Sequence, residues 1–94
     1  VFVSDGTVGL SLWEVDKSAT PVAFDRRKNI GLHHLALKVP DASTLQSVYA
    51  RVSTWPGVQT EFAPEPVAAG GSRMHCMVRE PGGTRLEFVC TLTD

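Results

Sequence analysis

Apolar and polar residues alternate along Gly31–Val39, which is the pattern of a strand that buries one face. Successive side chains of a strand point to opposite faces, so Leu35, Leu37 and Val39 share an apolar face. His34 then points to the other face. The pattern predicts a half-buried strand that turns one imidazole away from the core.

A second alternating segment, Arg85–Cys90, follows the turn Glu80–Thr84, in which Pro-Gly-Gly reverses the chain. Its apolar residues share one face: Leu86, Phe88 and Cys90. Glu87 therefore points to the opposite face. An imidazole and a carboxylate on neighbouring strands make half of a transition-metal site, so His34 and Glu87 are candidate metal ligands.

The region between these strands begins with a helical pattern. Asp41 follows Pro40 and is suited to cap a helix N-terminus. Apolar residues then recur at the spacing of one helix face: Leu45, Val48, Tyr49 and Val52. Trp55-Pro-Gly57 ends the pattern, so we expect a helix that packs one apolar stripe on the sheet.

Two further strands complete this region. Residues 58–62 predict a short strand, and residues 63–72 predict a loop because they contain two prolines and a Gly-Gly pair. Residues 73–79 alternate again, with His75 and Met77 on the face opposite the apolar one. We expect this strand to pair with the next through the hairpin, Arg79 opposite Arg85.

The start of the chain predicts β structure without a helix. Asp5-Gly6 is a strong hairpin signal between a short apolar strand and an alternating segment over 8–15. In the second segment Ser11 and Trp13 fall on the face opposite the apolar residues Val8, Leu10 and Leu12. The periodicity ends near Asp16, and residues 17–29 are interpreted as a linker.

Composition narrows the function classes. The 94 residues are enough for one domain, and 43% hydrophobic with 20% charged residues is ordinary for a globular protein. The net charge of −1 does not indicate binding to nucleic acid or to an anionic membrane. The basic run Arg26–Lys28 is interpreted as a solvated loop. With no spanning apolar run and no signal peptide, we expect a cytoplasmic protein, in which Cys76 and Cys90 are free buried thiols.

The order and spacing of these motifs resemble the vicinal oxygen chelate superfamily, which includes glyoxalases, bleomycin-resistance proteins and extradiol dioxygenases. The likeness is carried by the Gly-Leu-His-His-Leu-Ala-Leu-Lys-Val segment, the Asp41-capped helix and the Glu-Pro-Gly-Gly-Thr-Arg-Leu-Glu-Phe-Val segment. It implies an α+β fold: a complete βαβββ module over 30–94, preceded over 1–16 by the last strands of a truncated first module. Together they would form an open mixed sheet around a cleft.

The resemblance also implies a site. His34 and Glu87 match the second module's ligands for a divalent metal, and this ligand pair suits zinc, nickel, manganese, cobalt or iron. Ser11 falls where the first module's carboxylate would lie. From the face pattern, Ser11, Trp13, His75 and Met77 are candidate substrate contacts, with Trp13 and Met77 suited to an apolar or aromatic ligand.

Each candidate has a structural alternative. The alternative for His34 is a hydrogen bond inside a cleft without metal, and the alternative for Glu87 is an ion pair with Arg79, Arg85 or Lys38. By strand parity, His33 is expected on the helix side of the sheet, in a structural role.

These features favour a metal-dependent lyase, isomerase or dioxygenase that chelates vicinal oxygens of a small substrate. The alternatives are a metal-free small-molecule binding protein and an inactive truncated paralogue. The incomplete first module leaves an apolar face and an open strand edge, which a fragment, a rearranged gene or a partner chain would explain. We expect a homodimer that binds a small molecule, with neither nucleic acid nor membrane as a partner.

Overall fold

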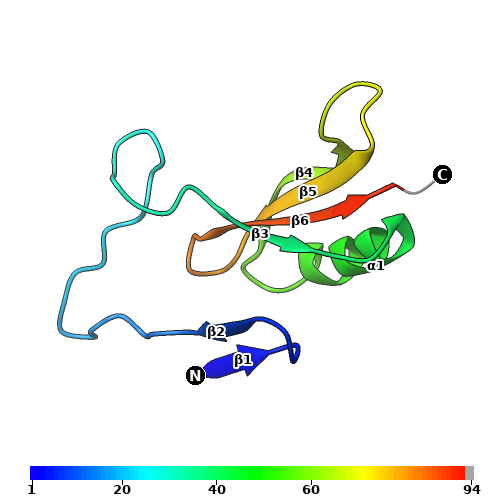
Figure 1. The fold of residues 1–94 in the computed structure, drawn as a ribbon. Helices are drawn as coiled ribbons and strands as arrows, with labels where there is room; N and C mark the ends of the chain where they lie inside the picture. Colours follow the sequence, from blue (N-terminus) through cyan, green and yellow to red (C-terminus); the bar gives the residue numbers. More distant parts are fainter. Residues whose placement is uncertain (93–94) are drawn as a thin grey trace.

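The computed structural model describes residues 1–92, which form one helix and six strands in two sheets (Figure 1). Along the chain these elements are β1 (Phe2–Ser4), β2 (Gly9–Ser11), β3 (Leu35–Lys38), α1 (Ala42–Ser53), β4 (Gln59–Pro66), β5 (Arg73–Arg79) and β6 (Arg85–Thr91). The fold is α+β, as the sequence predicted, and the main sheet is mixed and open.

The main sheet has the strand order β3-β6-β5-β4. β3 runs parallel to β6, whereas β5 is antiparallel to both of its neighbours. The register places Arg79 opposite Arg85 and Met77 opposite Glu87, so the predicted hairpin is confirmed. Because β3 lies beside β6, the segment that ends in His34 leads into the strand next to Glu87 (Figure 1).

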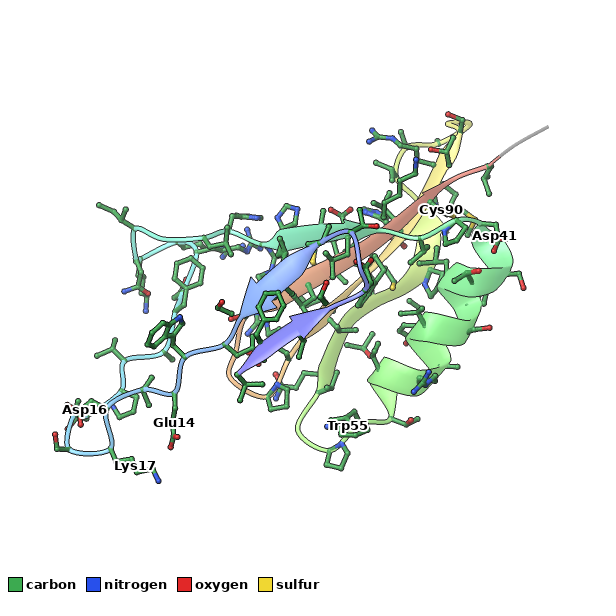
Figure 2. All side chains as sticks on the ribbon, turned by 60° about the horizontal axis from the view of Figure 1, so that its bottom comes forward. Glu14, Asp16, Lys17, Asp41, Trp55 and Cys90 are labelled. Atoms are coloured by element: carbon green, nitrogen blue, oxygen red, sulfur yellow. The ribbon has the colours of Figure 1, made fainter. Side chains whose placement is uncertain are left out.

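The helix begins and ends where the sequence predicted. The Asp41 side chain accepts a hydrogen bond from the backbone N–H of Thr44 at 2.7 Å, which also lowers the pKa of this carboxyl. Figure 2 shows Asp41 at one end of α1 and Trp55 just beyond the other. Gly57 then turns the chain with φ of +85°, a conformation that favours glycine.

One face of the sheet and the helix form the core. Leu45 of α1 is fully buried against Cys76 and Cys90 at the centre of this layer. Partly buried apolar side chains pack around them: Ala42, Val48, Tyr49, Met74 and Phe88. Both cysteines are free and buried as predicted, and burial raises the pKa of the Cys76 thiol.

The strand predicted over Gly31–Val39 is shorter in the structure. Regular pairing begins only at Leu35, so Gly31–His34 is an irregular segment. Gly31 lies against the ring of Phe24, and a β-carbon at this position would come within 2.8 Å of that ring. The parity argument for His33 therefore fails, because strand alternation does not extend to that residue.

β4 is longer than predicted. It continues from Gln59 to Pro66, although residues 63–72 were expected to form a loop. β4 is an edge strand, where Pro64 and Pro66 can be accommodated without loss of an interior ladder bond. The register shifts twice along β4, once on each side of Phe62. These irregularities decide which side chains of β4 lie on the face of the sheet opposite α1.

The first two strands form a separate antiparallel sheet. Asp5 closes their turn by accepting backbone hydrogen bonds from Thr7 and Val8, both at 2.8 Å, but β2 is only Gly9–Ser11 rather than the predicted 8–15. Val8 and Leu37 line the same shallow pocket, so the hairpin lies beside β3. Val8 is 47% exposed and Leu12 56% exposed, and the expected homodimer stays a prediction that light scattering can test.

Candidate functional site

The face of the main sheet opposite α1 carries a group of charged and polar side chains. Strand alternation brings His75, Met77 and Arg79 of β5 to this face, together with Arg85 and Glu87 of β6. Met77 is 5% exposed, so it is buried although the helix does not cover it. This face therefore carries the charged and polar side chains, and the buried side chain of Met77 lies among them.

Glu87 is the centre of the first cluster. Its Oε1 lies 3.1 Å from Nε2 of His34, and its Oε2 contacts Nδ1 of His75. The Glu87 side chain is 15% exposed, which makes polar partners necessary for both carboxylate oxygens. The predicted His34–Glu87 pair is thus brought together, with an imidazole on each side of the carboxylate.

His75, predicted above as a candidate substrate contact, is the second imidazole partner of Glu87. It lies two residues before Met77, which pairs with Glu87, so the two side chains are diagonal neighbours on one face. The ring of Phe62 packs against His75 with 4.7 Å between ring centroids. The contact between His75 and Glu87 could therefore be predicted from the sequence only through the register of the hairpin.

A second cluster is centred on Glu61, which the sequence analysis did not single out. Its two carboxylate oxygens accept hydrogen bonds from Nε and Nη2 of Arg85, each at 2.8 Å, and Oε1 also accepts from Nε of Arg79 at 2.9 Å. The bidentate bond to Arg85, strengthened by Arg79, lowers the pKa of Glu61 to about 2. Arg79 and Arg85, offered above as alternative partners of Glu87, bond Glu61 instead.

His33 joins the two clusters and lies on the side opposite to the one predicted. Nη1 of Arg85 is 3.0 Å from Nδ1 of His33, and the same Nδ1 lies 2.7 Å from Nδ1 of His34. Desolvation, followed by the charges of Arg85 and His34, lowers the pKa of His33 and favours its neutral form. Polar contacts therefore run without a break from Glu61 through Arg85, His33 and His34 to Glu87.

The remaining predicted contacts are not gathered at this cluster. Ser11 lies in β2, in the separate sheet, and is exposed. Trp13 follows β2 and is 90% exposed, whereas Met77 is buried beside Glu87. Trp13 and Met77 therefore do not form one apolar surface. Figure 2 shows the segment just beyond Trp13, labelled at Glu14, Asp16 and Lys17, at the opposite end of the view from Cys90.

The distance between the donor atoms of His34 and Glu87 shows whether the two side chains could bind one metal ion. Two neighbouring ligands at about 2.1 Å from a metal and at a right angle to each other are roughly 3 Å apart. The 3.1 Å separation of His34 Nε2 and Glu87 Oε1 fits that pair. Within residues 1–92, however, no group of three or more His, Cys, Asp or Glu side chains has the arrangement of a metal site.

Comparison with known proteins leaves the family open. No protein-family profile matches the sequence, and no curated protein matches it. The likeness to the vicinal oxygen chelate superfamily therefore stays a hypothesis that rests on the motifs described above. Residues 1–92 contain no helix that is long and apolar enough to span a membrane.

Proposed function

We propose that His34 and Glu87 bind a divalent metal on the open face of the sheet, and that the metal site acts on a small substrate with vicinal oxygens. The order strand, helix, strand, strand, strand from β3 to β6 supports the interpretation of this region as a βαβββ module. The observation that carries the proposal is the pairing of an imidazole nitrogen and a carboxylate oxygen at 3.1 Å, in a site that is partly closed to solvent.

The contact between His33 and His34 prepares His34 for this role. Metal-binding histidines commonly donate the N–H of their second ring nitrogen to a neighbouring acceptor. Nδ1 of His34 lies 2.7 Å from Nδ1 of His33, which has one lone pair in the neutral state favoured at His33. Nη1 of Arg85 also donates to the backbone carbonyl of His33 at 3.2 Å, and this bond would leave the lone pair of His33 Nδ1 to accept from His34. Without a metal, Nε2 of His34 carries the proton and donates it to Glu87. When a metal binds, the proton would be on Nδ1 and the lone pair of Nε2 would be available to the metal.

His75 is the nearest source of a further ligand. Its Nδ1 contacts the second oxygen of Glu87, so a small rotation of either side chain would exchange this hydrogen bond for a bond to a shared ion. Two histidines and one carboxylate leave positions open for substrate oxygens, and such a set accepts several first-row metals. A bound metal would supply Lewis acidity toward those oxygens.

The residues around the ligands have distinct tasks in this proposal. Glu87 balances the charge of the metal, and Met77 beneath it excludes water from one side of the site. His75, when it is not a ligand, holds a proton close to Glu87 and can exchange it with a substrate hydroxyl. This arrangement suits proton abstraction next to a carbonyl, the chemistry of lyases and isomerases, and with iron it suits a dioxygenase.

A second function is favoured by a different observation. Each oxygen of Glu87 already has an imidazole partner, so the carboxylate does not require a metal to offset its burial. The same face would then be a metal-free binding site for a small polar molecule. The two functions differ in one measurable property, which is the metal content of the purified protein.

Elemental mass spectrometry on protein purified without chelator or histidine tag tests the proposal. We expect about one metal ion per chain, and loss of that ion in both His34→Ala and Glu87→Gln. His33→Ala should weaken metal binding by about tenfold or more without abolishing it, because His33 orients a ligand. Glu14→Gln, at an exposed carboxylate in the segment after β2, is the matched control and should retain the metal.

Absence of metal from the wild-type protein, even after incubation with excess zinc, manganese, cobalt, nickel or iron(II), would refute the metal site. The metal-free binding function would then be the better explanation of the cluster. Retention of the metal in Glu87→Gln would refute the assignment of this ligand.

A further inference from the structure

A small pocket with a strongly basic lining lies next to the Glu61 cluster. Its volume is about 320 Å³, which is suitable for a small ligand or one part of a larger ligand. Its lining residues are Phe24, Asp25, Arg26, Arg27, Arg79, Gly83 and Arg85. Four of these seven residues are arginines, from two distant parts of the sequence.

We propose that this pocket binds a carboxylate or phosphate group of an anionic small molecule. Resting on the proposed function, we further propose that this group is the acidic end of the substrate whose oxygens reach His34 and Glu87. The net charge of the whole chain, which is only −1, does not reveal this local group of arginines.

The charge balance of the pocket favours an anion. Asp25 is the one acidic residue in the lining, and Glu61 offsets part of the charge of Arg79 and Arg85 from outside it. Arg79 is 50% exposed and donates only its Nε to Glu61, so its terminal nitrogens remain available. Within residues 1–92, the side chains of Arg26 and Arg27 form no ion pair.

The wall of the pocket that carries Arg26 and Arg27 is a defined turn. Asp25 Oδ1 accepts a hydrogen bond from the backbone N–H of Arg27 at 2.8 Å, and Asn29 Oδ1 accepts one from the backbone N–H of Asp25 at 2.6 Å. Phe24 anchors this turn by packing closely on Gly31, just before His33. The arginines are thus held beside the sheet by local hydrogen bonds and one aromatic contact.

The pocket is joined to the candidate metal site through Arg85. This side chain lines the pocket and also contacts His33, which in turn contacts His34. An anion in the pocket would therefore place the rest of the molecule near the His34–Glu87 pair.

The chemistry of the lining defines the ligand class. Guanidinium groups present paired N–H donors that match the oxygens of carboxylates and phosphates. Phe24 adds an apolar surface next to these donors. A small aromatic or aliphatic acid fits this combination, whereas a neutral analogue of the same shape would leave the arginines without an acceptor.

Calorimetric titration with benzoate, phenyl phosphate and benzamide tests the proposal on the full chain at low ionic strength. We expect at least one of the two anions to bind and benzamide not to bind, and the better anion identifies the group that the pocket takes. Arg79→Gln and Arg26→Gln should each weaken anion binding by about tenfold, as expected for loss of one charge-assisted contact. Arg26 is on the exposed turn, so its variant is expected to fold even if Arg79→Gln does not.

Arg73→Gln is the matched control, because Arg73 lies on the same strand as Arg79 but at its other end, about 20 Å away. It should change anion affinity less than about twofold, since exposed charges at that distance are largely screened. Equal weakening by Arg73→Gln, equal binding of benzamide, or no binding of either anion would refute the pocket.

The two proposals can fail separately. Anion binding by a wild-type protein that takes up no metal would support the pocket and refute the metal function. Metal binding without anion binding would refute the pocket and leave the metal site standing. If both bind, an anion-affinity loss in Arg79→Gln with unchanged metal content assigns the two ligands to separate residues.

Discussion

The two faces of the main sheet are built from the same strands but differ in what they bury. On the helix side, the buried residues are apolar and form the core. They are Leu45, Cys76, Val78 and Cys90, each at most 1% exposed. On the opposite side, the buried residues include Arg85, and the neighbouring side chains are held by hydrogen bonds and ion pairs. Alternation along β5 and β6 places the apolar core and the polar clusters on opposite faces of the sheet.

This difference also separates what stabilises each face. The helix side depends on removal of apolar surface from water, which does not depend on the ionisation of side chains. The opposite side depends on the carboxylate of Glu61, whose pKa is lowered by Arg85 and Arg79, and on the hydrogen bonds of Glu87 to two histidines. Substitutions and pH changes can therefore test the two faces independently.

The largest effect on stability is expected from Leu45→Ala. Leu45 is fully buried between the helix and the sheet, so its truncation leaves a cavity in the core. We expect the free energy of unfolding to fall by about 3 kcal/mol, measured by urea denaturation. Leu12→Ala, at a residue that is 56% exposed, is the control and should change it by less than about 0.5 kcal/mol. A similar loss from both would mean that the helix side is not the core.

Glu61→Gln tests the polar side. The pKa of Glu61 is lowered from 4.5 to about 2 by Arg85 and Arg79, so the unfolded chain binds the proton more tightly than the folded chain. This contribution is present above pH 4.5 and is lost as the pH falls toward 2. We expect Glu61→Gln to lower the free energy of unfolding at pH 7 by about 2 kcal/mol and to reduce its slope in this acid range.

Unfolding measured as a function of pH distinguishes this effect from loss of packing. Glu65→Gln, on the same strand and at a residue that takes part in no ion pair within residues 1–92, should leave the acid slope unchanged. If Glu61→Gln keeps the wild-type slope between pH 4.5 and 2, the ion pairs with Arg79 and Arg85 do not form in solution.

Asp41→Ala tests how the helix is held over the apolar face. It removes the acceptor for the Thr44 backbone N–H, so we expect the midpoint of urea unfolding to fall. The midpoint should fall by less than it does for Glu61→Gln. Asp41→Asn should retain most of the stability, because asparagine is also a good cap. An unchanged midpoint in Asp41→Ala would show that sheet packing alone fixes the helix start.

The smallest effect is expected at Trp13, which lies outside both faces. Its side chain is 90% exposed, so Trp13→Ala should change the free energy of unfolding by less than about 0.5 kcal/mol. Urea denaturation followed by circular dichroism measures this without relying on tryptophan fluorescence. A loss above about 1 kcal/mol would show that the segment after β2 packs on the protein in solution.

Some features of the site followed directly from the sequence. Strand parity in Arg85–Cys90 separated Glu87 from the core residues, and the Pro-Gly-Gly turn set the hairpin register that pairs Met77 with Glu87. The cap at Asp41 and the Leu45 stripe placed the helix. These predictions succeeded because each depends on interactions between residues that are close in the sequence.

Other features depended on the tertiary structure. The prediction for His33 was wrong because β3 begins at Leu35, and nothing local reveals where regular pairing starts. Glu61 reaches Arg79 and Arg85 only because β4 becomes the edge strand beside β5, a pairing that the local pattern does not reveal. The basic pocket likewise combines a turn at 25–29 with the β5–β6 hairpin, which are more than fifty residues apart.

The sequence by itself thus determined the helix, the β5–β6 hairpin and their buried faces, because side-chain periodicity is a local property of the backbone. The same pattern indicated Glu87 as a ligand candidate, whereas His34 lies just before the regular part of β3. Only the tertiary structure decided that two imidazoles share the carboxylate of Glu87 and that Glu61 holds two arginines. Those contacts depend on which strands become neighbours and in what register, and that choice is made by the packing of the whole sheet.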